Sequence, residues 1–333
     1  MLTKADDYPI HQTAEPIAYS GTDRNFYDRY FFNGYSRSSD VFFAAALGVY
    51  PHLNIMDAAF SVIVDGVQHN LHASRYLNME RMDTHVGPIS VDVVEPLQVL
   101  RIRVAENEHG LKADITYRGR APALKEPRFT RRQGARTLMD VTRLTQNGTW
   151  EGWIEVKGKR IEVKPDDFIG TRDRSWGVRP IGAADQQPLV PPMEFQFFWL
   201  WAPLNFDDRI SLFHVNDDEH GEAWNLSGMV CPLGADAKSE EMDRVSYEIA
   251  YHSGSRHAKS CSIFFEDRKG AKTRIDLTPR FNFYMMGIGY THPEWSHGAH
   301  KGDNALGYEE FKLADIKSFA PPYLHVQALS DAV

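Results

Sequence analysis

The residues with the clearest capacity for chemistry lie between positions 170 and 179, in the sequence GTRDRSWGVR. A carboxylate beside guanidinium groups normally stays ionised, so Asp173 could orient a substrate hydroxyl or act as a base. To act as an acid, it would need apolar burial. We expect this carboxyl to be oriented or tuned by three nearby arginines, which are Arg172, Arg174 and Arg179.

The same segment contains Trp176, whose flat indole could form the wall of a pocket for an apolar or cationic molecule. A second interpretation is purely structural. Asp173 and the arginines would then form an ion-pair network at a junction between two lobes, and the indole would fill part of the core. The sequence leaves both interpretations open.

Histidines are concentrated in a second segment, residues 284–300, where three of them and a glutamate fall within nine residues. If the chain before residue 293 is a strand, Tyr290 and His292 share one face of it. A sharp turn at the following proline would bring His297 back toward them. Because imidazole titrates near neutral pH, we expect His292 or His297 to donate or accept a proton, and Tyr290 and Trp295 to contact the substrate.

Two alternatives remain for this histidine segment. Imidazoles and a carboxylate are ligands that suit iron or zinc, although their spacing here matches no established metal motif. A metal-dependent enzyme would use His292, Glu294, His297 and His300 together. The segment could instead be a polar loop that closes the mouth of a barrel, with partly solvated histidines.

A third segment, residues 26–35, is rich in aromatic residues and has the sequence FYDRYFFNGY. We expect it to form core or pocket lining. A phenol or an amide in an apolar cavity must find a hydrogen-bond partner, which a ligand oxygen could supply. Tyr30 and Asn33 are therefore further candidates for ligand binding.

Several familiar signatures are absent from the sequence. It has no GxGxxG after a strand, no GxxxxGK[ST], no GxSxG and no HExxH motif, which argues against nucleotide-dependent and serine-hydrolase classes. We therefore predict no cofactor. The net charge of −8 and the pI near 6.0 would repel a phosphate backbone, so nucleic acid is not an expected partner.

The expected location is the cytoplasm. Cys231 and Cys261 are too few for a disulfide framework and form no CxxC pair, which indicates a reducing compartment. The first 20 residues lack the basic and apolar regions of an export signal. No stretch approaches 18 uninterrupted apolar residues, so we expect no membrane span.

The elements that must position these residues are predicted to be strands. Apolar and polar residues alternate through residues 111–118, and the preceding run 100–104 should pair with them across a turn that contains Gly110. Similar hairpins are expected around residues 65–66 and 158–159, and across 267–270. Further strands are expected at 195–201, 210–215 and 245–251. Helical periodicity is confined to short stretches at 136–144 and 311–318.

Antiparallel strands in this number must close or stack to hide their edges, so we predict an all-β protein with two barrel-like or sandwich-like lobes. The connector should fall between residues 166 and 192, because 182–192 is rich in Pro, Gln and Ala. We place the N-terminal lobe at residues 1–175 and the C-terminal lobe at 176–333.

The sequence resembles the AttH-like and carotenoid-hydratase (hydroxyneurosporene synthase) group of tandem lipocalin-like proteins. The resemblance rests on GTRDRSWGVRP, on GIGYTHPEWSHG more than 100 residues later, and on the N-terminal YDRYFFNGYSRSSDVFFAAALGVYP. It implies two calycin-like β-barrels packed together, with an apolar pocket. Hydration, cyclisation or pericyclic chemistry takes place there without an organic cofactor in characterised relatives.

Three functions follow as hypotheses. The first is a cofactor-independent hydratase, isomerase, cyclase or lyase for a terpenoid, steroid or aromatic molecule, with Asp173, His292 and His297 as catalytic groups. The second is a noncatalytic carrier of a hydrophobic ligand, and the third is the metal-dependent enzyme. Convergence of these three side chains on one cavity would favour catalysis, whereas outward or salt-bridged positions would favour a carrier. A homodimer is the default expectation for assembly.

Overall fold

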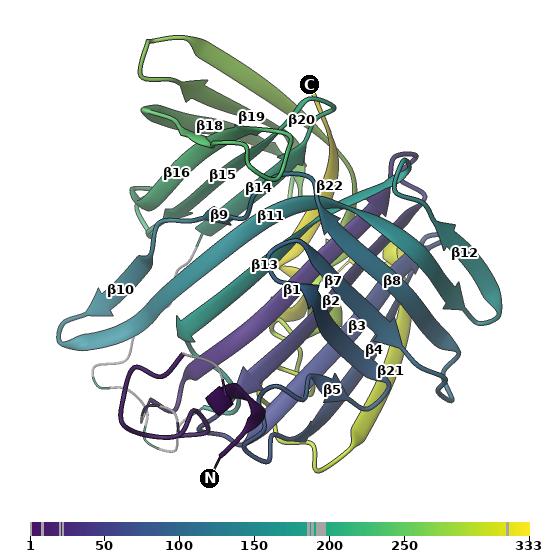
Figure 1. The fold of residues 1–333 in the computed structure, drawn as a ribbon. Coiled ribbons are helices and arrows are strands. Elements are labelled where there is room, and N and C mark those ends of the chain that lie inside the picture. Colours follow the sequence, from purple (N-terminus) through teal and green to yellow (C-terminus); the bar gives the residue numbers. More distant parts are fainter. Residues whose placement is uncertain are drawn as a thin grey trace.

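The computed structural model describes residues 2–7, 10–19, 21, 23–184, 187, 190, 198–317 and 320–333. Strands dominate this part of the chain, and the helices in it are short 3-10 turns (Figure 1). The all-β prediction is confirmed. None of the described helices has the length and apolar character that crossing a membrane requires.

The first lobe is one strongly curled antiparallel sheet (Figure 1). Its strands follow the order β21-β4-β3-β2-β1-β13-β11-β8-β7-β6-β5, and β9, β10 and β12 also pair with β11. The bounds are β1 Phe26–Ser36, β2 Val41–Tyr50, β3 Ile55–Val64, β4 Val67–Tyr76, β5 His85–Val86, β6 Ile89–Glu95, β7 Val99–Val104, β8 Leu111–Gly119, β9 Leu124–Lys125, β10 Phe129–Gln133, β11 Arg136–Val156, β12 Lys159–Val163, β13 Phe168–Val178 and β21 Ala305–Lys312.

The predicted hairpins of this lobe are confirmed. β7 pairs with β8, β3 with β4, and β11 with β12. Asp65 and Gly66 both have positive φ values, 52° and 73°, as the tight turn between β3 and β4 requires. Lys157 and Gly158 repeat this geometry between β11 and β12, with φ values of 50° and 84°.

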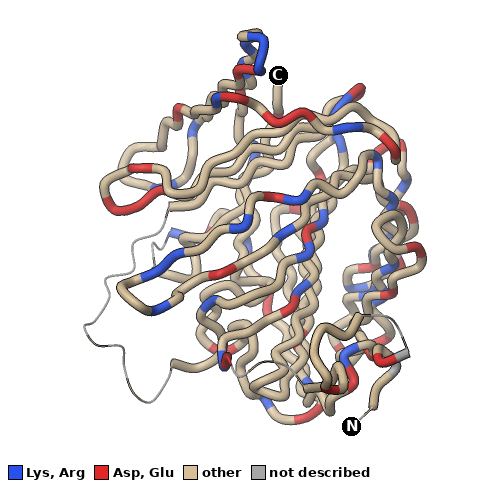
Figure 2. The backbone as a smooth tube through the Cα atoms, turned by 60° about the vertical axis from the view of Figure 1, so that its left-hand side comes forward, with Lys and Arg blue, Asp and Glu red and all other residues tan. Residues whose placement is uncertain are grey.

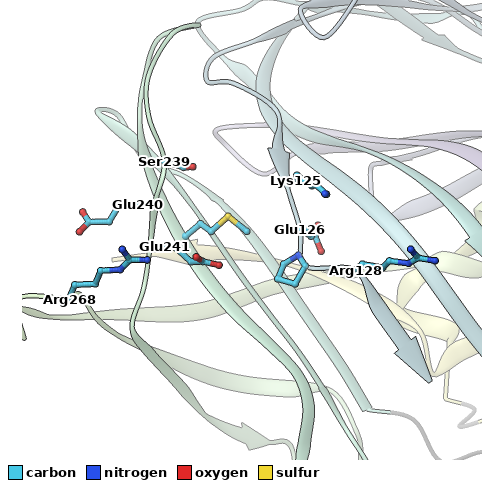
Figure 3. A pocket seen from close by; sticks show the side chains of 9 residues that line it. Lys125, Glu126, Arg128, Ser239, Glu240, Glu241 and Arg268 are labelled. Carbon is cyan, nitrogen blue, oxygen red and sulfur yellow. The ribbon is translucent and has the colours of Figure 1, made fainter. Parts of the chain in front are cut away.

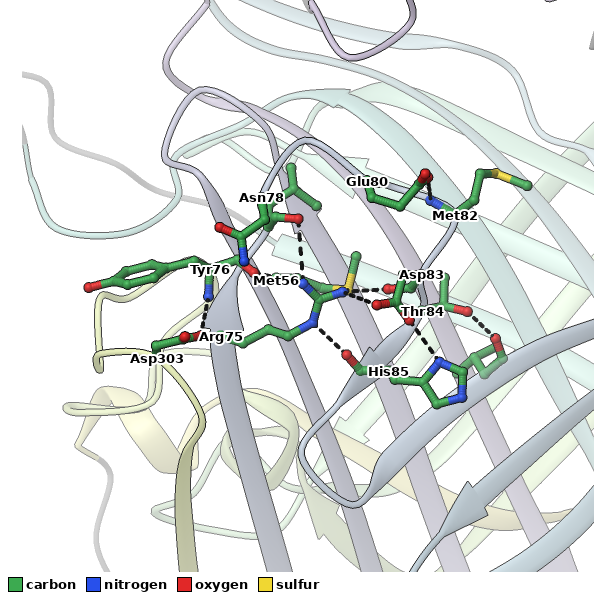
Figure 4. Close-up of polar contacts among 12 residues, drawn as sticks. Met56, Arg75, Tyr76, Asn78, Glu80, Met82, Asp83, Thr84, His85 and Asp303 are labelled. Atoms are coloured by element: carbon green, nitrogen blue, oxygen red, sulfur yellow. Dashed lines mark hydrogen bonds and ion pairs between the residues drawn. The ribbon is translucent and has the colours of Figure 1, made fainter. Parts of the chain in front are cut away.

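Side chains close the seam between the two ends of the curled sheet. Arg75, in β4, donates from Nε to the backbone carbonyl of His85 in β5 and also reaches the carbonyl of Asp83 (Figure 4). Farther along the seam, Lys157 contacts Glu310 of β21 at 2.6 Å. These contacts join strands that the backbone ladder leaves unpaired, so the sheet closes around its own core.

The interior of the first lobe is filled by large side chains, which include Phe32, Phe43, Phe60, Tyr117 and Trp150, all of them buried. Glycine lets the strands approach this cluster closely. A Cβ atom on Gly170 would lie 2.1 Å from the carbonyl oxygen of Asn33, the same oxygen that accepts a hydrogen bond from Trp150 Nε1 at 2.9 Å. The lobe is therefore a packed barrel along these strands.

The second lobe contains two four-stranded antiparallel sheets, drawn in green and yellow in Figure 1. One has the order β14-β15-β16-β17, with bounds Phe198–Asn205, Arg209–Asp217, Ala223–Pro232 and Glu240–Glu241. The other has the order β18-β19-β20-β22, with bounds Arg244–Tyr251, Ala258–Glu266, Lys272–Tyr284 and Val326–Ala332. Apolar side chains of both sheets, such as Phe213 and Ile263, share one core. The expected β19–β20 hairpin is confirmed.

The two-lobe division at residue 175 stays a prediction. β13 runs through that position, and β21, from the C-terminal part of the chain, pairs with β4 in the first sheet. Residues 195–197 of the expected strand 195–201 lie outside the described residues, and β14 begins at Phe198.

Two predicted helices are wrong. Residues 136–144 belong to β11, which pairs with β10 on one side and β13 on the other. Of residues 311–318, the first two end β21, and a 3-10 turn, η3, covers Leu313–Asp315. Strand pairing on both edges outweighs a weak local helical pattern, because each pairing adds backbone hydrogen bonds and packing.

Acidic and basic residues are interspersed along the strands and turns of both lobes (Figure 2). Most are exposed. Among the described residues, the buried acidic and basic side chains other than histidines are Arg29, Glu126, Arg143, Arg172, Asp173 and Asp217. Because a buried charge is costly without partners, these positions need a specific explanation.

Candidate active site between the lobes

Three adjacent strands, β1, β13 and β11, place a group of polar residues on the outer face of the first sheet. The register aligns them in three cross-strand rows: Arg29, Ser175 and Arg143; Phe31, Asp173 and Thr145; and Asn33, Thr171 and Asn147. Since side chains alternate between the two faces of a strand, all nine residues share one face. That face is turned toward the second lobe, because Phe31 packs against Trp201 of β14.

Asp173 occupies the centre of these rows. Asp173 is 8% exposed, and no described residue donates a hydrogen bond to its carboxyl. Burial raises the pKa of Asp173 to about 6, against the opposing effect of Arg143 and Arg29. A carboxyl with a pKa near neutral can both give and take a proton under physiological conditions.

Arg143 is held beside Asp173 by a second carboxylate. Its Nε and Nη2 atoms donate to the two oxygens of Glu126, at 2.9 and 2.5 Å. Burial alone would raise the pKa of Glu126, but the charge and hydrogen bonds of Arg143 hold it below its ordinary value. Thr145 and Trp201 also donate to Glu126. This carboxylate therefore stays ionised and fixes the arginine.

An aromatic wall faces these charges from the second lobe. Trp199 and Trp201 lie on the same face of β14, and the Arg143 guanidinium carbon lies 5.0 and 5.7 Å from their ring centres. Trp199 also contacts His325, at 5.6 Å between ring centroids. The wall thus extends from Arg143 to a histidine at the far side of the site.

A second polar group surrounds Tyr290. Arg29 donates to its hydroxyl at 3.1 Å, and the rings of His297 and His325 lie at 4.4 and 4.6 Å. Burial lowers the pKa of His325 to about 4, and the charges of Arg29 and Arg179 add to the effect. His325 is therefore a neutral imidazole at neutral pH, able to accept a proton or a hydrogen bond.

His297 is locked into a structural role. Arg179 donates to its Nδ1 at 2.9 Å, so its Nε2 carries the proton and donates to the carbonyl of Ile288, also at 2.9 Å. Burial, together with Arg29 and Arg179, lowers its pKa well below the ordinary value. Both ring nitrogens are thus occupied by protein partners, which leaves neither for a substrate.

The arginines adjacent to Asp173 in sequence do not lie beside it. Arg172 contacts Gln146 and the Tyr117 ring, and Arg174 pairs with Asp28 and stacks on Tyr30, all on the opposite face of the sheet. Tyr30 accordingly packs against the interior of the first lobe.

Two other predicted binding residues also lie away from the carboxyl. Trp176 is 38% exposed, so it neither fills core nor encloses a pocket. Asn33 shares the outer face with Asp173, but its amide is engaged by Gln327 and by the backbone of Thr171.

His292 lies in a different cluster, with His72 of β4 and Glu309 of β21. The Nε2 atoms of the two histidines are 3.4 and 3.6 Å from Glu309 Oε1. Trp295 stacks on His72 at 5.6 Å, over Gly307. Catalytic convergence of His292 with Asp173 is therefore not seen.

This cluster has the composition of a metal site but not its proton arrangement. The backbone N–H groups of Glu294 and Trp295 donate to His292 Nδ1, at 3.0 and 2.9 Å. A neutral imidazole must then carry its proton on Nε2, the atom that faces Glu309, so no lone pair is left there for a cation. His292 fits a hydrogen-bonded anchor for the loop better than a ligand.

The four residues of the metal-dependent alternative are also not brought together. Glu294 pairs with Lys301, and His300 stacks on Tyr76 and contacts its hydroxyl. His297 is occupied as described above, and His292 faces Glu309.

A cleft of about 680 Å³ opens beside the Asp173 group. Figure 3 shows Lys125, Glu126 and Arg128 on one side of it and Ser239, Glu240, Glu241 and Arg268 on the other. Its lining is polar and contains none of the predicted catalytic residues. Glu126 both borders the cleft and binds Arg143, so the cleft lies next to the buried group.

A second, small cavity lies between β3, β4 and the segment 288–299, and it is lined by His72, Trp295 and His297 among others. Its volume of about 10 Å³ corresponds to a single water molecule. It cannot hold an organic substrate.

The sequence predicts a role for Asp173, which stays a prediction, but it does not reveal the residues grouped around it. Arg29, Arg143 and Glu126 act on the carboxyl, and Trp199, Trp201 and His325 extend the group from Arg143. Arg29 was inside a segment marked as pocket lining, and the tryptophans were inside a predicted strand. The sequence marks both segments, but it does not show which of their residues lie on the face of the sheet that carries Asp173. Arg143 was placed in a helix, which hid its position two residues from Thr145 on the same strand face.

Comparisons with known proteins define the fold. The chain belongs to a family whose model is described as a family of unknown function (DUF8625) and matches residues 2–333. No curated protein matches the chain by sequence.

Two solved structures share the fold. A protein described as an AttH from Nitrosomonas europaea aligns with a TM-score of 0.52 at 12% identity, over 92% of this chain and 94% of the other. Kievitone hydratase from Nectria haematococca aligns with a TM-score of 0.50 at 12% identity, over 75% of each chain. At this identity the likeness concerns the fold alone, and it confirms the resemblance to the AttH-like group of lipocalin-like proteins.

Proposed function

We propose that this member of the DUF8625 family is an acid–base enzyme that acts on a hydrophobic small molecule, with Asp173 as the proton-transfer group between the lobes. One observation carries the proposal. Asp173 is a buried carboxyl without a hydrogen-bond partner among the described residues, and its pKa is raised to about 6 although two arginines lie nearby. Structural carboxylates in this protein, such as Glu126, are instead fully paired.

The arrangement suits general acid catalysis. The protonated Asp173 gives its proton to a carbon of a substrate double bond, and the resulting carboxylate is stabilised by Arg29 and Arg143 on the same sheet face. The same carboxylate then takes a proton back as the product forms. The carbocation formed by this protonation can take up water, lose a different proton or be attacked by another double bond, which gives a hydrated, isomerised or cyclised product. Run in reverse, the hydration is a lyase reaction.

The walls of the site favour an apolar, unsaturated substrate. Trp199 and Trp201 present their aromatic faces to Arg143, and Trp201 also packs on Phe31, which lies next to Asp173 in the same row. Flat apolar molecules stack on such faces. One protein of the same fold is named a hydratase, which agrees with proton transfer to a double bond.

The test is deuterium transfer from solvent to a panel of unsaturated probes: geraniol, a prenylated phenol, 4-vinylphenol and a steroid enone. The full-length protein is incubated with each probe in heavy water, and both recovered probe and product are examined by mass spectrometry. We expect label at a former double-bond carbon of at least one probe. Asp173→Asn should reduce the rate about 100-fold or more, because the acid is lost while the shape is kept.

Asp114→Asn is the matched control, since Asp114 pairs with Arg101 on the outside of the sheet, far from the second lobe. It should label probes at the wild-type rate. If Asp173→Asn labels as fast as the control, the assignment of Asp173 is wrong. Saturable binding of a probe without any labelling would identify the protein as a carrier instead.

A further inference from the structure

Two unpaired polar atoms lie side by side in the row next to Asp173. Thr171 and Asn147 are directly opposite each other on β13 and β11, and each residue is 1% exposed. The hydroxyl of Thr171 and the side-chain oxygen of Asn147 have no hydrogen-bond partner among the described residues. Leaving such atoms dry costs free energy, so a buried pair of this kind calls for a polar molecule between them.

The orientation of both groups is fixed by neighbours. Asn147 donates through Nδ2 to the carbonyl of Leu204 in β14, which assigns its other atom as the free oxygen. The backbone N–H of Thr171 donates to Asn33, whose own amide is held by Gln327 of β22. A hydrogen-bond acceptor from Asn147 and a rotatable hydroxyl from Thr171 are thus presented by a rigid framework that spans both lobes.

The spacing connects this pair to the proton-transfer group. Thr171 precedes Asp173 by two residues on the same strand face, a rise of about 7 Å along the strand. The proposal requires that one water bonded to Thr171 at about 3 Å also reaches the Asp173 carboxyl, which a separation of about 7 Å along the strand allows. Such a water would have three polar partners, which is the usual number for a buried one.

We infer that Thr171 and Asn147 position the water that adds to the substrate, so that the proposed enzyme is a hydratase rather than an isomerase or cyclase. This inference rests on the proposed function of Asp173. Asp173 transfers its proton to one carbon of the double bond, and the oxygen of the held water forms a bond to the neighbouring carbon. The surplus proton of that water passes to the Asp173 carboxylate, which restores the acid. The sum is one double bond and one water converted to an alcohol.

The position of the water is tested without any substrate. A high-resolution crystal structure of the full-length protein should show a water within about 3 Å of both Thr171 Oγ1 and Asn147 Oδ1. The same structure of Thr171→Val should lack it. If the two side chains are bonded to each other or to another protein group in the wild type, the inference is wrong.

The consequence for catalysis is tested with the probe that gives the largest deuterium signal. In water labelled with oxygen-18, product alcohol reports water addition, whereas deuterium in recovered alkene reports proton transfer alone. Thr171→Val should lower the ratio of alcohol formation to alkene labelling about 10-fold, and Thr171→Ser, which keeps the hydroxyl, should restore it. Thr142→Val is the matched control, because Thr142 lies on β11 but on the opposite face.

The two proposals fail in different ways. If Asp173→Asn loses both isotope signals and Thr171→Val leaves their ratio unchanged, the water-positioning role is overturned and the acid role stands. A Thr171→Val protein that loses both signals equally also contradicts positioning, since a structural defect would act on both. If Asp173→Asn retains both signals, the proposed function itself falls, whatever Thr171 does.

Discussion

The two faces of strands β1, β13 and β11 differ sharply in composition. The inner face contributes Phe32 and contacts Trp150 in a core of interlocking rings. The outer face, one residue away along the same strands, bears Arg29, Asp173 and Arg143. Period-two alternation thus separates a face that holds the barrel together from a face equipped for proton transfer.

The difference shows that the inner face stabilises the fold, whereas the outer face contains groups that destabilise it. On the inner face Trp150 donates to the carbonyl of Asn33, and Arg172 donates through Nε to Gln146 although its Nη2 has no partner among the described residues. The outer face has a buried carboxyl with a raised pKa, at Asp173, and oxygens on Thr171 and Asn147 without a partner among the described residues. Unpaired buried groups destabilise a fold, and they are found where a ligand is to be bound.

Removing a ring from the inner face should have the largest effect on stability. Trp150→Ala deletes a fully buried indole that contacts Phe32, Phe43 and Tyr117, and should lower the free energy of unfolding by about 4 kcal/mol. Urea unfolding followed by far-ultraviolet circular dichroism measures it. Trp176→Ala, which removes an indole that is 38% exposed, is the control and should cost less than about 1 kcal/mol. Equal losses would show that the inner face has no special role in stability.

Breaking the Arg143–Glu126 pair on the outer face should have the next largest effect. Arg143→Met leaves Glu126 buried with its charge unpaired, and should cost about 3 kcal/mol at neutral pH in the same urea assay. The double variant Arg143→Met, Glu126→Gln removes both charges and should recover most of the loss. The prediction is contradicted if Arg143→Met is as stable as wild type, or if the double variant is no more stable than Arg143→Met. Either result would mean that the two charges are not buried away from water.

The sequence predicted the inner face better than the outer one. Alternation and turn residues located about half of the described strands and the hairpins around Asp65 and Gly110, because both signals are local. Asp173 is a candidate because its segment is unusual in composition. Its partners could not be found, since Arg143 and Trp199 are placed by register across strands and by the packing of one lobe on another, which depend on contacts far apart in sequence.

Proximity in sequence also misled the interpretation. Arg172 and Arg174 are the nearest charges to Asp173 along the chain, yet an odd separation on a strand puts them on the opposite face. Only a strand assignment for this segment, which the structure provides as β13, separates them from Asp173. The histidine segment misled for another reason: His292 and His297 belong to a loop, where no period links sequence spacing to direction.

The last prediction isolates Asp173, and its effect vanishes toward acidic pH. Its pKa is raised to about 6 in the folded state, so the folded protein binds this proton more tightly than the unfolded chain does. The resulting stabilisation is complete below about pH 4 and is lost as the pH rises through about 6. Asp173→Asn has no such proton. It should therefore nearly match wild type near pH 4 and exceed its free energy of unfolding by about 3 kcal/mol near pH 8.

Urea unfolding of both proteins across this pH range provides the measurement. Asp57, whose pKa burial also raises to about 6, is present in both and cancels from the difference. Asp114→Asn, on the exposed ion pair, should follow wild type at every pH. A difference between Asp173→Asn and wild type that is constant with pH would mean that folding does not raise the pKa of this carboxyl, and a wild type that loses stability relative to the variant on acidification would mean that the carboxyl belongs to a structural ion pair. The outer face would then be structural, like the inner one, and the difference between them would not support a role in proton transfer.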